Sequence, residues 1–146
     1  MDFTIHKADK RHLVDINRLI VDMKIGEPMN ELNGPFWFVR IDNRIVACAG
    51  LEFIPDQKAA VLAHLAVEKE FRRHGIGSVL IEHRTDFAKR KGVEILALAT
   101  MYYLFNFYKK RGFKTCPRKN LPETVKNYWM FTAQRYKKCA VMIREI

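Results

Sequence analysis

The spacing of apolar residues in the middle of the chain predicts a strand, a loop, a helix and a second strand. Val61–Val67 is a short apolar run of the kind found in buried strands. The next apolar positions recur at the spacing of one helix face, and they are Ile76, Val79, Leu80 and Phe87. Gly92 ends this helix, and Val93–Ala99 is a second apolar run. Two neighbouring strands joined by such a helix run parallel to each other.

A short strand and a helix are predicted near the start of the chain. Phe3 and Ile5 alternate with polar residues, as in a strand with one buried face. Asp9 is a suitable N-cap for a helix that continues to about residue 24. The apolar face of this helix consists of Leu13, Ile16, Leu19 and Ile20. A second short helix is expected before the strong turn signal Asn33-Gly34-Pro35.

An antiparallel hairpin is predicted next. Phe36–Ile41 and Arg44–Phe53 are separated by Asp42-Asn43, a pair that suits a two-residue hairpin turn. Another turn, at residues 55–58, leads back to the central strand. A chain of 146 residues is long enough to bury its own core. We therefore expect one domain over residues 1–146, with a mixed α/β fold.

The last third of the chain is predicted to contain two helices and two strands. Thr100 is placed to cap a helix that ends near Arg111, and Phe113–Cys116 is a short strand. Pro122 fits the first turn of a helix that reaches about residue 128. Apolar and polar residues alternate over Lys138–Arg144, which predicts a final strand.

The charge of the chain narrows the choice of partners. The formal net charge is +10, which favours anionic partners such as nucleic acid, phosphorylated cofactors or acidic substrates. Acidic residues interrupt the basic ones, and they include Glu68, Glu70, Glu82 and Asp86. No sequence signature of RNA or DNA binding is present. We therefore expect no nucleic-acid partner.

Cysteine spacing and hydropathy indicate a cytoplasmic protein. Cys48, Cys116 and Cys139 occur singly, which is typical of reduced thiols, and no ligand cluster for a metal is visible. Charges follow Met1 at once, unlike in a signal peptide. The longest uncharged run, Ile95–Tyr108, is shorter than the roughly 20 residues that a spanning helix needs. We expect no membrane segment and no metal.

The loop between the central strand and the central helix has the features of a phosphate site. Arg72-Arg73-His74-Gly75-Ile76-Gly77 combines basic residues with the backbone N–H groups of a helix N-terminus. It does not match a Walker loop, which needs G-x-x-x-x-G-K-[ST]. A dinucleotide fingerprint, G-x-G-x-x-G, fails because Leu80 occupies its third glycine position.

The pattern resembles that of the GNAT superfamily of acyl-CoA-dependent N-acetyltransferases. Leu65-Ala66-Val67 followed by Arg72–Gly77 is similar to the family's strand and [QR]-x-x-G-x-[GA] loop, and Tyr108–Phe113 is similar to its second element. The resemblance implies a mixed sheet of six or seven strands: an antiparallel meander, then a parallel pair joined by the coenzyme-binding helix. It also implies that acetyl-CoA binds at Leu65, Ala66, Val67, Arg72, Arg73, His74, Gly75, Ile76, Gly77 and Ser78.

The resemblance implies roles for several residues in direct acetyl transfer to a primary amine. The Val67 N–H would stabilise the oxyanion, and the Tyr108 hydroxyl would protonate the leaving thiolate. Tyr108 is alternatively a core aromatic, since aromatic residues are dense around it. Val61 occupies the position of the base in histone-acetylating members. Glu52 and His64 are the candidate bases, although a buried structural histidine and a solvated strand end explain them equally well.

The C-terminal third is similar to the acetyltransferase domain of N-acetylglutamate synthases. The matching residues are Arg111-Gly112-Phe113, Leu121-Pro122, Tyr128, Gln134-Arg135 and Lys138. This similarity implies that Arg135 holds a substrate carboxylate and that the acceptor is an amino acid such as glutamate. Lys137 occupies the position of a serine of that family. A protein or peptide acceptor, a non-catalytic acyl-CoA sensor and a homodimer stay open.

Overall fold

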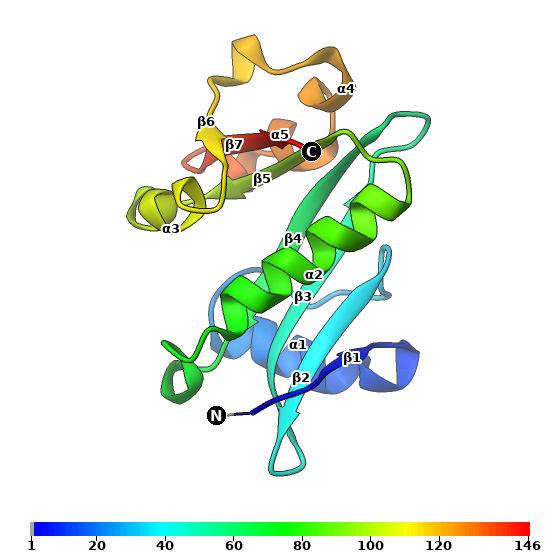
Figure 1. Cartoon of the computed structure of the whole chain (residues 1–146), viewed down its shortest axis with the longest axis vertical. Coiled ribbons are helices and arrows are strands. Elements are labelled where there is room, and N and C mark those ends of the chain that lie inside the picture. Colours follow the sequence, from blue (N-terminus) through cyan, green and yellow to red (C-terminus); the bar gives the residue numbers. More distant parts are fainter. Residues whose placement is uncertain (1) are drawn as a thin grey trace. The chain divides into compact units, whose positions relative to one another are not determined.

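The computed structural model describes residues 2–146, which form a seven-stranded sheet in the order β1-β2-β3-β4-β5-β7-β6 (Figure 1). The strands are β1 (Ile5–Lys7), β2 (Phe36–Ile41), β3 (Arg44–Phe53), β4 (Ala59–Val67), β5 (Ile95–Thr100), β6 (Lys114–Thr115) and β7 (Ala140–Glu145). β4 and β5 are parallel, and the pairs β1–β2, β2–β3, β5–β7 and β6–β7 are antiparallel. The predicted mixed sheet of six or seven strands is confirmed.

The helices are mostly short. The α-helices are α1 (Leu13–Asp22), α2 (Ile76–Arg90), α3 (Phe105–Lys109), α4 (Glu123–Lys126) and α5 (Trp129–Thr132). The 3-10 turns are η1 (Lys10–His12), η2 (Lys69–Phe71), η3 (Tyr102–Leu104), η4 (Arg118–Asn120) and η5 (Gln134–Tyr136). Among residues 2–146, no helix is long and apolar enough to cross a membrane.

Contacts divide the chain into two compact units, each built from separate stretches. The first unit contains the residues up to Glu52 together with Leu62–Asp86, and the second contains Phe53–Val61 together with Phe87–Ile146. β4 and α2 therefore contribute residues to both units. The expectation of a single domain over residues 1–146 stays a prediction.

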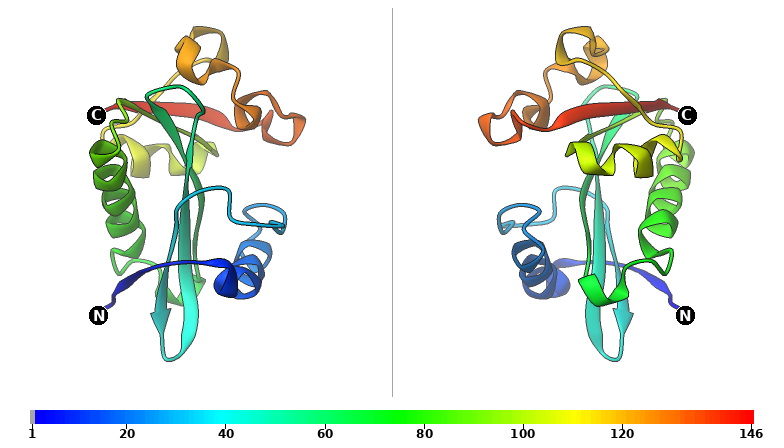
Figure 2. Two further views of the ribbon diagram at one scale, coloured as in Figure 1. Left: turned by 90° about the vertical axis from the view of Figure 1, so that its right-hand side faces the viewer. Right: turned by 90° about the vertical axis from the view of Figure 1, so that its left-hand side faces the viewer.

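In the first unit, two helices cover opposite faces of the strands. Figure 2 shows α1 on one face of β2 and β3 and the first turns of α2 on the other. Asp9 accepts a hydrogen bond from the Arg11 N–H, and a capping box with His12 completes this start, as the predicted N-cap requires. The core under α1 consists of Ile16, Leu19, Ile20, Phe36, Phe38, Ile45, Cys48 and Ala66.

The predicted hairpin of β2 and β3 is confirmed at both strands and at the turn. Asp42 and Asn43 adopt φ angles of 51° and 62°, the left-handed backbone that a tight type I′ turn needs. The register shifts between Val39 and Arg40, where the pairing is irregular. Residues 36–39 and 45–52 are all buried, so both faces of these strands are covered.

In the second unit, β7 lies between β5 and β6. Val141, Met142 and Ile143 are all buried, so β7 does not show the strict alternation that the sequence predicts. The segment before β7 is held by Arg118, whose guanidinium donates to the carbonyls of Phe131 (3.1 Å), Tyr136 (2.8 Å) and Cys139 (2.8 Å). Arg118 thus links α5, η5 and the residue before β7 to one another.

The predicted short helix before residue 33 is wrong. Residues 23–35 form turns and bends. The Asn17 side chain explains this, since its amide donates to the Met29 carbonyl and accepts from the Met29 N–H, both at 2.8 Å. A side chain that bonds both backbone groups of one residue competes with helical hydrogen bonds.

Two other element predictions need correction. Thr100 belongs to β5, and the expected helix over residues 100–111 is replaced by η3 and α3. Val79 does not belong to the buried face of α2, since its side chain is 43% exposed. The buried face is formed by Ile76, Leu80, Ile81, Arg84, Thr85 and Ala88.

Candidate active site

The candidate coenzyme loop connects the end of β4 to the start of α2 in the first unit. After Val67, the chain forms η2 and then the exposed residues 72–75. Arg73 and Gly75 have left-handed φ angles of 69° and 80°. The Val79 N–H donates to the Gly75 carbonyl at 3.0 Å, so the amides of residues 76–78 lie at the helix N-terminus. The backbone therefore has the arrangement that the phosphate prediction requires.

Arg72 contacts the chain itself in this structure. Its Nε donates to the Val67 carbonyl at 3.0 Å, and its Nη2 lies 3.7 Å from the Met23 Sδ. The side chain is exposed, although it ties the loop to the strand end. The contact fixes the peptide that follows Val67. This peptide lies next to the Val67 N–H, which is expected to stabilise the oxyanion.

β4 is interrupted at Ala63-His64, a feature that the sequence does not predict. His64 has a φ of 55°, the left-handed region that a residue other than glycine adopts rarely. Its carbonyl accepts a hydrogen bond from the Cys48 thiol at 3.5 Å, and its half-buried ring lies 6.0 Å from the Phe36 ring. We call this interruption the β4 kink. The candidate base His64 is thus also the residue at which the strand turns.

The parallel ladder of β4 ends before the kink. Ala59, Ala60 and Val61 pair with Ile95, Leu96 and Ala97. β4 then continues for the residues up to Val67. Leu65 and Val67 are half-buried on this last part of the strand, and Ala66 is buried.

Glu52 is buried at the end of β3, with an exposed fraction of 4%. It is therefore no solvated strand end, which corrects one of the two interpretations of this residue. The preceding Leu51 N–H donates to the Pro35 carbonyl at 3.0 Å. A Cβ at Gly34 would lie 2.4 Å from the Leu51 carbonyl oxygen, so only glycine allows this loop to approach β3.

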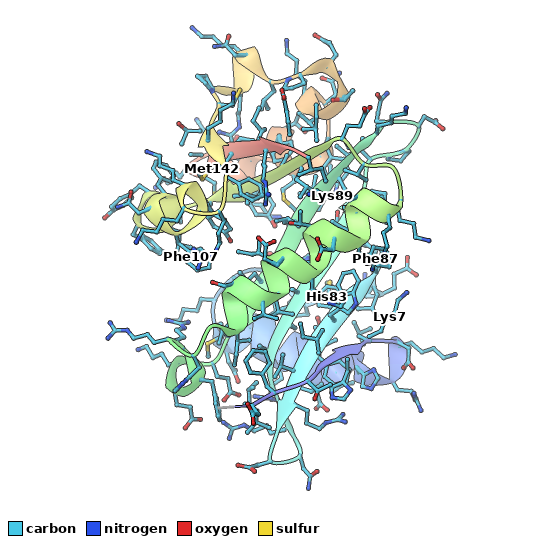
Figure 3. The ribbon with its side chains drawn as sticks, in the orientation of Figure 1. Lys7, His83, Phe87, Lys89, Phe107 and Met142 are labelled. Carbon is cyan, nitrogen blue, oxygen red and sulfur yellow. The ribbon has the colours of Figure 1, made fainter. Side chains whose placement is uncertain are left out.

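Arg84 is a fully buried basic residue that the sequence analysis missed. Its Nε donates to the Leu80 carbonyl at 3.1 Å, and its Nη1 lies 2.9 Å from the Gly50 oxygen and 3.4 Å from the Ala63 oxygen. A signal existed, because Arg84 follows Leu80 by four residues and precedes Ala88 by four. His83 lies beside it on α2 and meets the Trp37 ring edge-on at 5.4 Å (Figure 3).

Tyr108, the candidate acid, belongs to α3 in the second unit. It is 8% exposed and packs edge-on against Phe107 (centroids 5.1 Å apart) and Phe113 (5.9 Å). Arg111 stacks on the Phe107 ring, 3.8 Å from its centroid (Phe107 is labelled in Figure 3). The aromatic density of the sequence is thus a packed cluster, and the remaining exposure of Tyr108 is small.

Arg135, the candidate carboxylate ligand, lies on η5 in the second unit. Its guanidinium carbon is 5.2 Å from the ring centroid of Trp129 and 5.2 Å from that of Tyr136. These two rings contact each other at 5.8 Å and at 62°. The guanidinium is exposed and lies within cation–π distance of both rings.

Metal-ligating residues do not gather in the described part of the chain. Residues 2–146 contain no group of three or more His, Cys, Asp or Glu side chains that could hold a metal ion.

The chain combines a mixed sheet, a helix that starts at a basic glycine loop and an interrupted strand before that loop. These features define a fold that binds an acyl-coenzyme. The chain belongs to the acetyltransferase (GNAT) family, whose model matches residues 7–113. The members of this family are acetyltransferases that use acetyl-CoA as co-substrate.

The alignments with two curated relatives cover only part of the length of those proteins. The protein named "Probable N-acetyltransferase camello" from Xenopus tropicalis is 29% identical over 122 residues, which covers 81% of this chain and 55% of that protein. The amino-acid acetyltransferase of Escherichia coli K12 is 31% identical over 96 residues, which covers 66% of this chain and 21% of that protein. This chain therefore spans about half, and about a fifth, of the lengths of these two relatives.

Solved structures share the fold at low sequence identity. The N-acetylglutamate synthase of Neisseria gonorrhoeae, complexed with coenzyme A and N-acetyl-glutamate, superposes with a TM-score of 0.82 at 21% identity. The alignment covers 99% of this chain and 35% of that one. Rv2747 of Mycobacterium tuberculosis, in complex with CoA and NLQ, gives a TM-score of 0.78 at 16% identity, with 98% and 99% of the two chains covered.

Proposed function

We propose that this chain is an acetyl-CoA-dependent N-acetyltransferase that transfers the acetyl group directly to the primary amine of an amino acid. The observation that carries the proposal is the position of the loop at residues 72–77, directly between β4 and the N-terminus of α2. In a member of this family, this loop is the expected binding site of the coenzyme.

The coenzyme diphosphate is proposed to bind the amides of residues 75–78. A helix N-terminus attracts anions through its N–H groups and its dipole, and α2 is a helix of 15 residues. Arg73 and His74 are exposed beside it. The thioester arm is proposed to lie along Leu65–Val67, which follows the end of the parallel ladder.

The proposed reaction is a single attack by a neutral amine. The nitrogen lone pair attacks the thioester carbonyl carbon, and the Val67 N–H stabilises the resulting oxyanion. The carbon–sulfur bond then breaks, the amine gives up its proton to His64 or Glu52, and Tyr108 protonates the thiolate. The burial of Glu52 and the half-buried position of His64 support a proton acceptor on either residue. Both candidates are retained.

The proposed acceptor carries a carboxylate that binds Arg135. The Arg135 guanidinium lies beside the rings of Trp129 and Tyr136, and a guanidinium can form a bidentate bond to a carboxylate. The relatives named amino-acid acetyltransferase support an amino acid as acceptor. Glutamate is our first choice within this class.

A thiol-release assay with acetyl-CoA and a panel of amino acids tests the proposal. We expect turnover with an acidic amino acid, and Arg135→Ala should raise the KM for that acceptor about tenfold or more while kcat changes less. Turnover only with peptides, detected by mass spectrometry, would contradict the amino-acid acceptor. Coenzyme binding without any turnover would show a non-catalytic sensor.

The coenzyme loop has its own test in Ser78. A carboxylate at this position favours the helix dipole but repels a diphosphate, so Ser78→Glu should keep the fold and weaken acetyl-CoA binding about tenfold or more. Ser78→Ala is the matched control and should bind acetyl-CoA as the wild type does. Titration calorimetry measures both, and equal affinity of Ser78→Glu and wild type would contradict the site.

A further inference from the structure

The β4 kink is held by side chains that come from two other elements. The Ala63 carbonyl lies 3.4 Å from the Nη1 of Arg84 on α2, and the His64 carbonyl accepts from the thiol of Cys48 on β3. A left-handed residue inside a strand takes its neighbouring peptides out of the regular ladder. Donors from outside the ladder therefore bond both carbonyls of the kink.

Arg84 also links the kink to the neighbouring strand. The same Nη1 lies 2.9 Å from the Gly50 carbonyl of β3, and its Nε donates to Leu80 within α2. Figure 1 shows the first turns of α2 running across β3 and β4. The guanidinium thus fixes helix, strand and kink relative to one another.

The burial of Arg84 indicates a specific task. Its side chain has an exposed fraction of 0%. Burying a cation is costly, and a methionine of similar length would fill the same space without that cost. The guanidinium group is therefore useful here because its donors form a planar fork, which can reach carbonyls on different elements at once.

We propose that Arg84 is a positioning residue for acetyl transfer, which holds the β4 kink and thereby the direction of the Leu65–Val67 backbone. This inference rests on the proposed roles of His64 and Val67. In a strand, a shift of one residue turns every following side chain to the opposite face and every following N–H to the opposite edge. Loss of the kink would therefore turn the Val67 N–H away from the oxyanion that it is proposed to bind.

The test compares Arg84→Met and Arg84→Lys with a neighbour. Methionine removes the donors, and lysine keeps the charge but replaces the planar fork with a single nitrogen. Thr85→Val is the matched control, because Thr85 is also buried in α2 (1% exposed) but its hydroxyl donates to Ile81 within the helix. Each folded variant is measured for kcat, for the KM of acetyl-CoA and for the ¹³Cα and ¹³Cβ chemical shifts of His64.

We expect Arg84→Met to lower kcat about tenfold or more, since misplaced groups cost rate steeply, while the KM of acetyl-CoA changes less. Its His64 shifts should move from left-handed toward extended values. Arg84→Lys should have a kcat and His64 shifts between those of Arg84→Met and the wild type. It replaces Arg84→Met if the latter does not fold. Thr85→Val should keep the shifts and kcat of the wild type.

Unchanged His64 shifts, or changed shifts with an unchanged kcat, would overturn the inference. A kcat loss in Thr85→Val equal to that in Arg84→Met would overturn it as well, because lost stability would then be sufficient to explain both losses. If the wild type shows no turnover, the proposed function fails, but the His64 shifts still decide whether Arg84 holds the kink.

Discussion

Cys48 shows how burial sets the chemistry of a single side chain. The thiol is fully buried, and this burial raises its pKa from 9.0 to about 12, although the charge of Arg84 acts in the opposite direction. A thiolate at this position would have no contact with water. The folded protein therefore keeps Cys48 as a hydrogen-bond donor to the kink over the whole physiological pH range.

We predict that this raised pKa makes the protein less stable at alkaline pH. The unfolded chain loses the Cys48 proton above pH 9, whereas the folded chain keeps it to about pH 12. The unfolded state then binds fewer protons, so the free energy of unfolding falls as pH rises, by up to about 1.4 kcal/mol per pH unit. Urea unfolding at several pH values measures this slope.

Cys48→Ala is the control for the alkaline slope. It should reduce the fall in stability between pH 9 and pH 12 by the part that the thiol contributes. An identical slope in Cys48→Ala and the wild type would contradict the assignment. Alkylation gives a second measurement, since iodoacetamide should modify Cys48 only after unfolding.

Gly50 allows a close approach of the Phe36 ring to β3 in the first unit. A Cβ at this position would lie 2.6 Å from the Phe36 ring, which is itself 3% exposed and contacts the His64 ring. We predict that Gly50→Ala lowers the free energy of unfolding by about 1–3 kcal/mol, because the ring has no room to move. Chemical denaturation measures this loss.

Gly26→Ala is the comparison for Gly50→Ala. A Cβ at Gly26 would meet only the Ile20 side chain, at 3.9 Å, an ordinary contact. Stability should therefore change by less than about 1 kcal/mol, and a restricted unfolded chain can even raise it. Equal losses in the two variants would show that the Phe36 ring does not limit the space at Gly50.

At the scale of elements, the sequence predicts those that local patterns specify. The β2–β3 hairpin is confirmed, because Asp42 and Asn43 suit its turn. The helix α2 is confirmed, because its apolar spacing and the glycine after it indicate the same helix. The β4 kink could not be predicted, since the donors that bond its carbonyls come from β3 and α2, far from His64 in the sequence.

The same distinction applies to the candidate site. The loop at residues 72–77 is local, so its place between β4 and α2 follows from the sequence. Arg72 could not be placed from its neighbours in sequence, because its bonds reach the Val67 carbonyl and Met23. The roles of Tyr108, Glu52, His64 and Arg135 stay predictions.

The segment at residues 23–35 is bonded to a side chain of α1. Asn17 bonds both backbone groups of Met29 at 2.8 Å, and no regular element is present within this segment. We predict that Asn17→Ala loosens it and speeds cleavage by trypsin after Lys24, with a stability loss of about 1–3 kcal/mol. Limited proteolysis with mass spectrometry identifies the cleavage site.

Val14→Ala is the control on the same helix, because Val14 is 79% exposed. It should leave the rate of cleavage after Lys24 as in the wild type. If Asn17→Ala were cleaved no faster than Val14→Ala, the two hydrogen bonds to Met29 would not be what holds the segment.

At the scale of the whole molecule, the net charge of +10 suits an anionic co-substrate. Some of the basic residues are paired locally, since Arg44 pairs with Glu68 and Glu70 in the first unit. The expectations of a cytoplasmic location and of no nucleic-acid partner stay predictions.

We predict that acetyl-CoA binding weakens with salt. The coenzyme carries several phosphate charges, and raising the salt from about 0.05 M to about 0.5 M shortens the range of their attraction several-fold. The Kd from titration calorimetry should rise severalfold, whereas sucrose at equal osmolality should have little effect. A Kd independent of salt would mean that the positive charge contributes nothing to coenzyme binding.

The order of the strands has a consequence for synthesis on the ribosome. β7 is made after β6, yet it lies between β5 and β6 and pairs with both. When the nascent chain has emerged only to residue 130, one edge of β5 is thus unpaired. The two-residue β6 also has no strand to pair with at this stage. Translation must pass Ala140–Glu145 before either edge is covered, so this interval is when chaperones would be needed most.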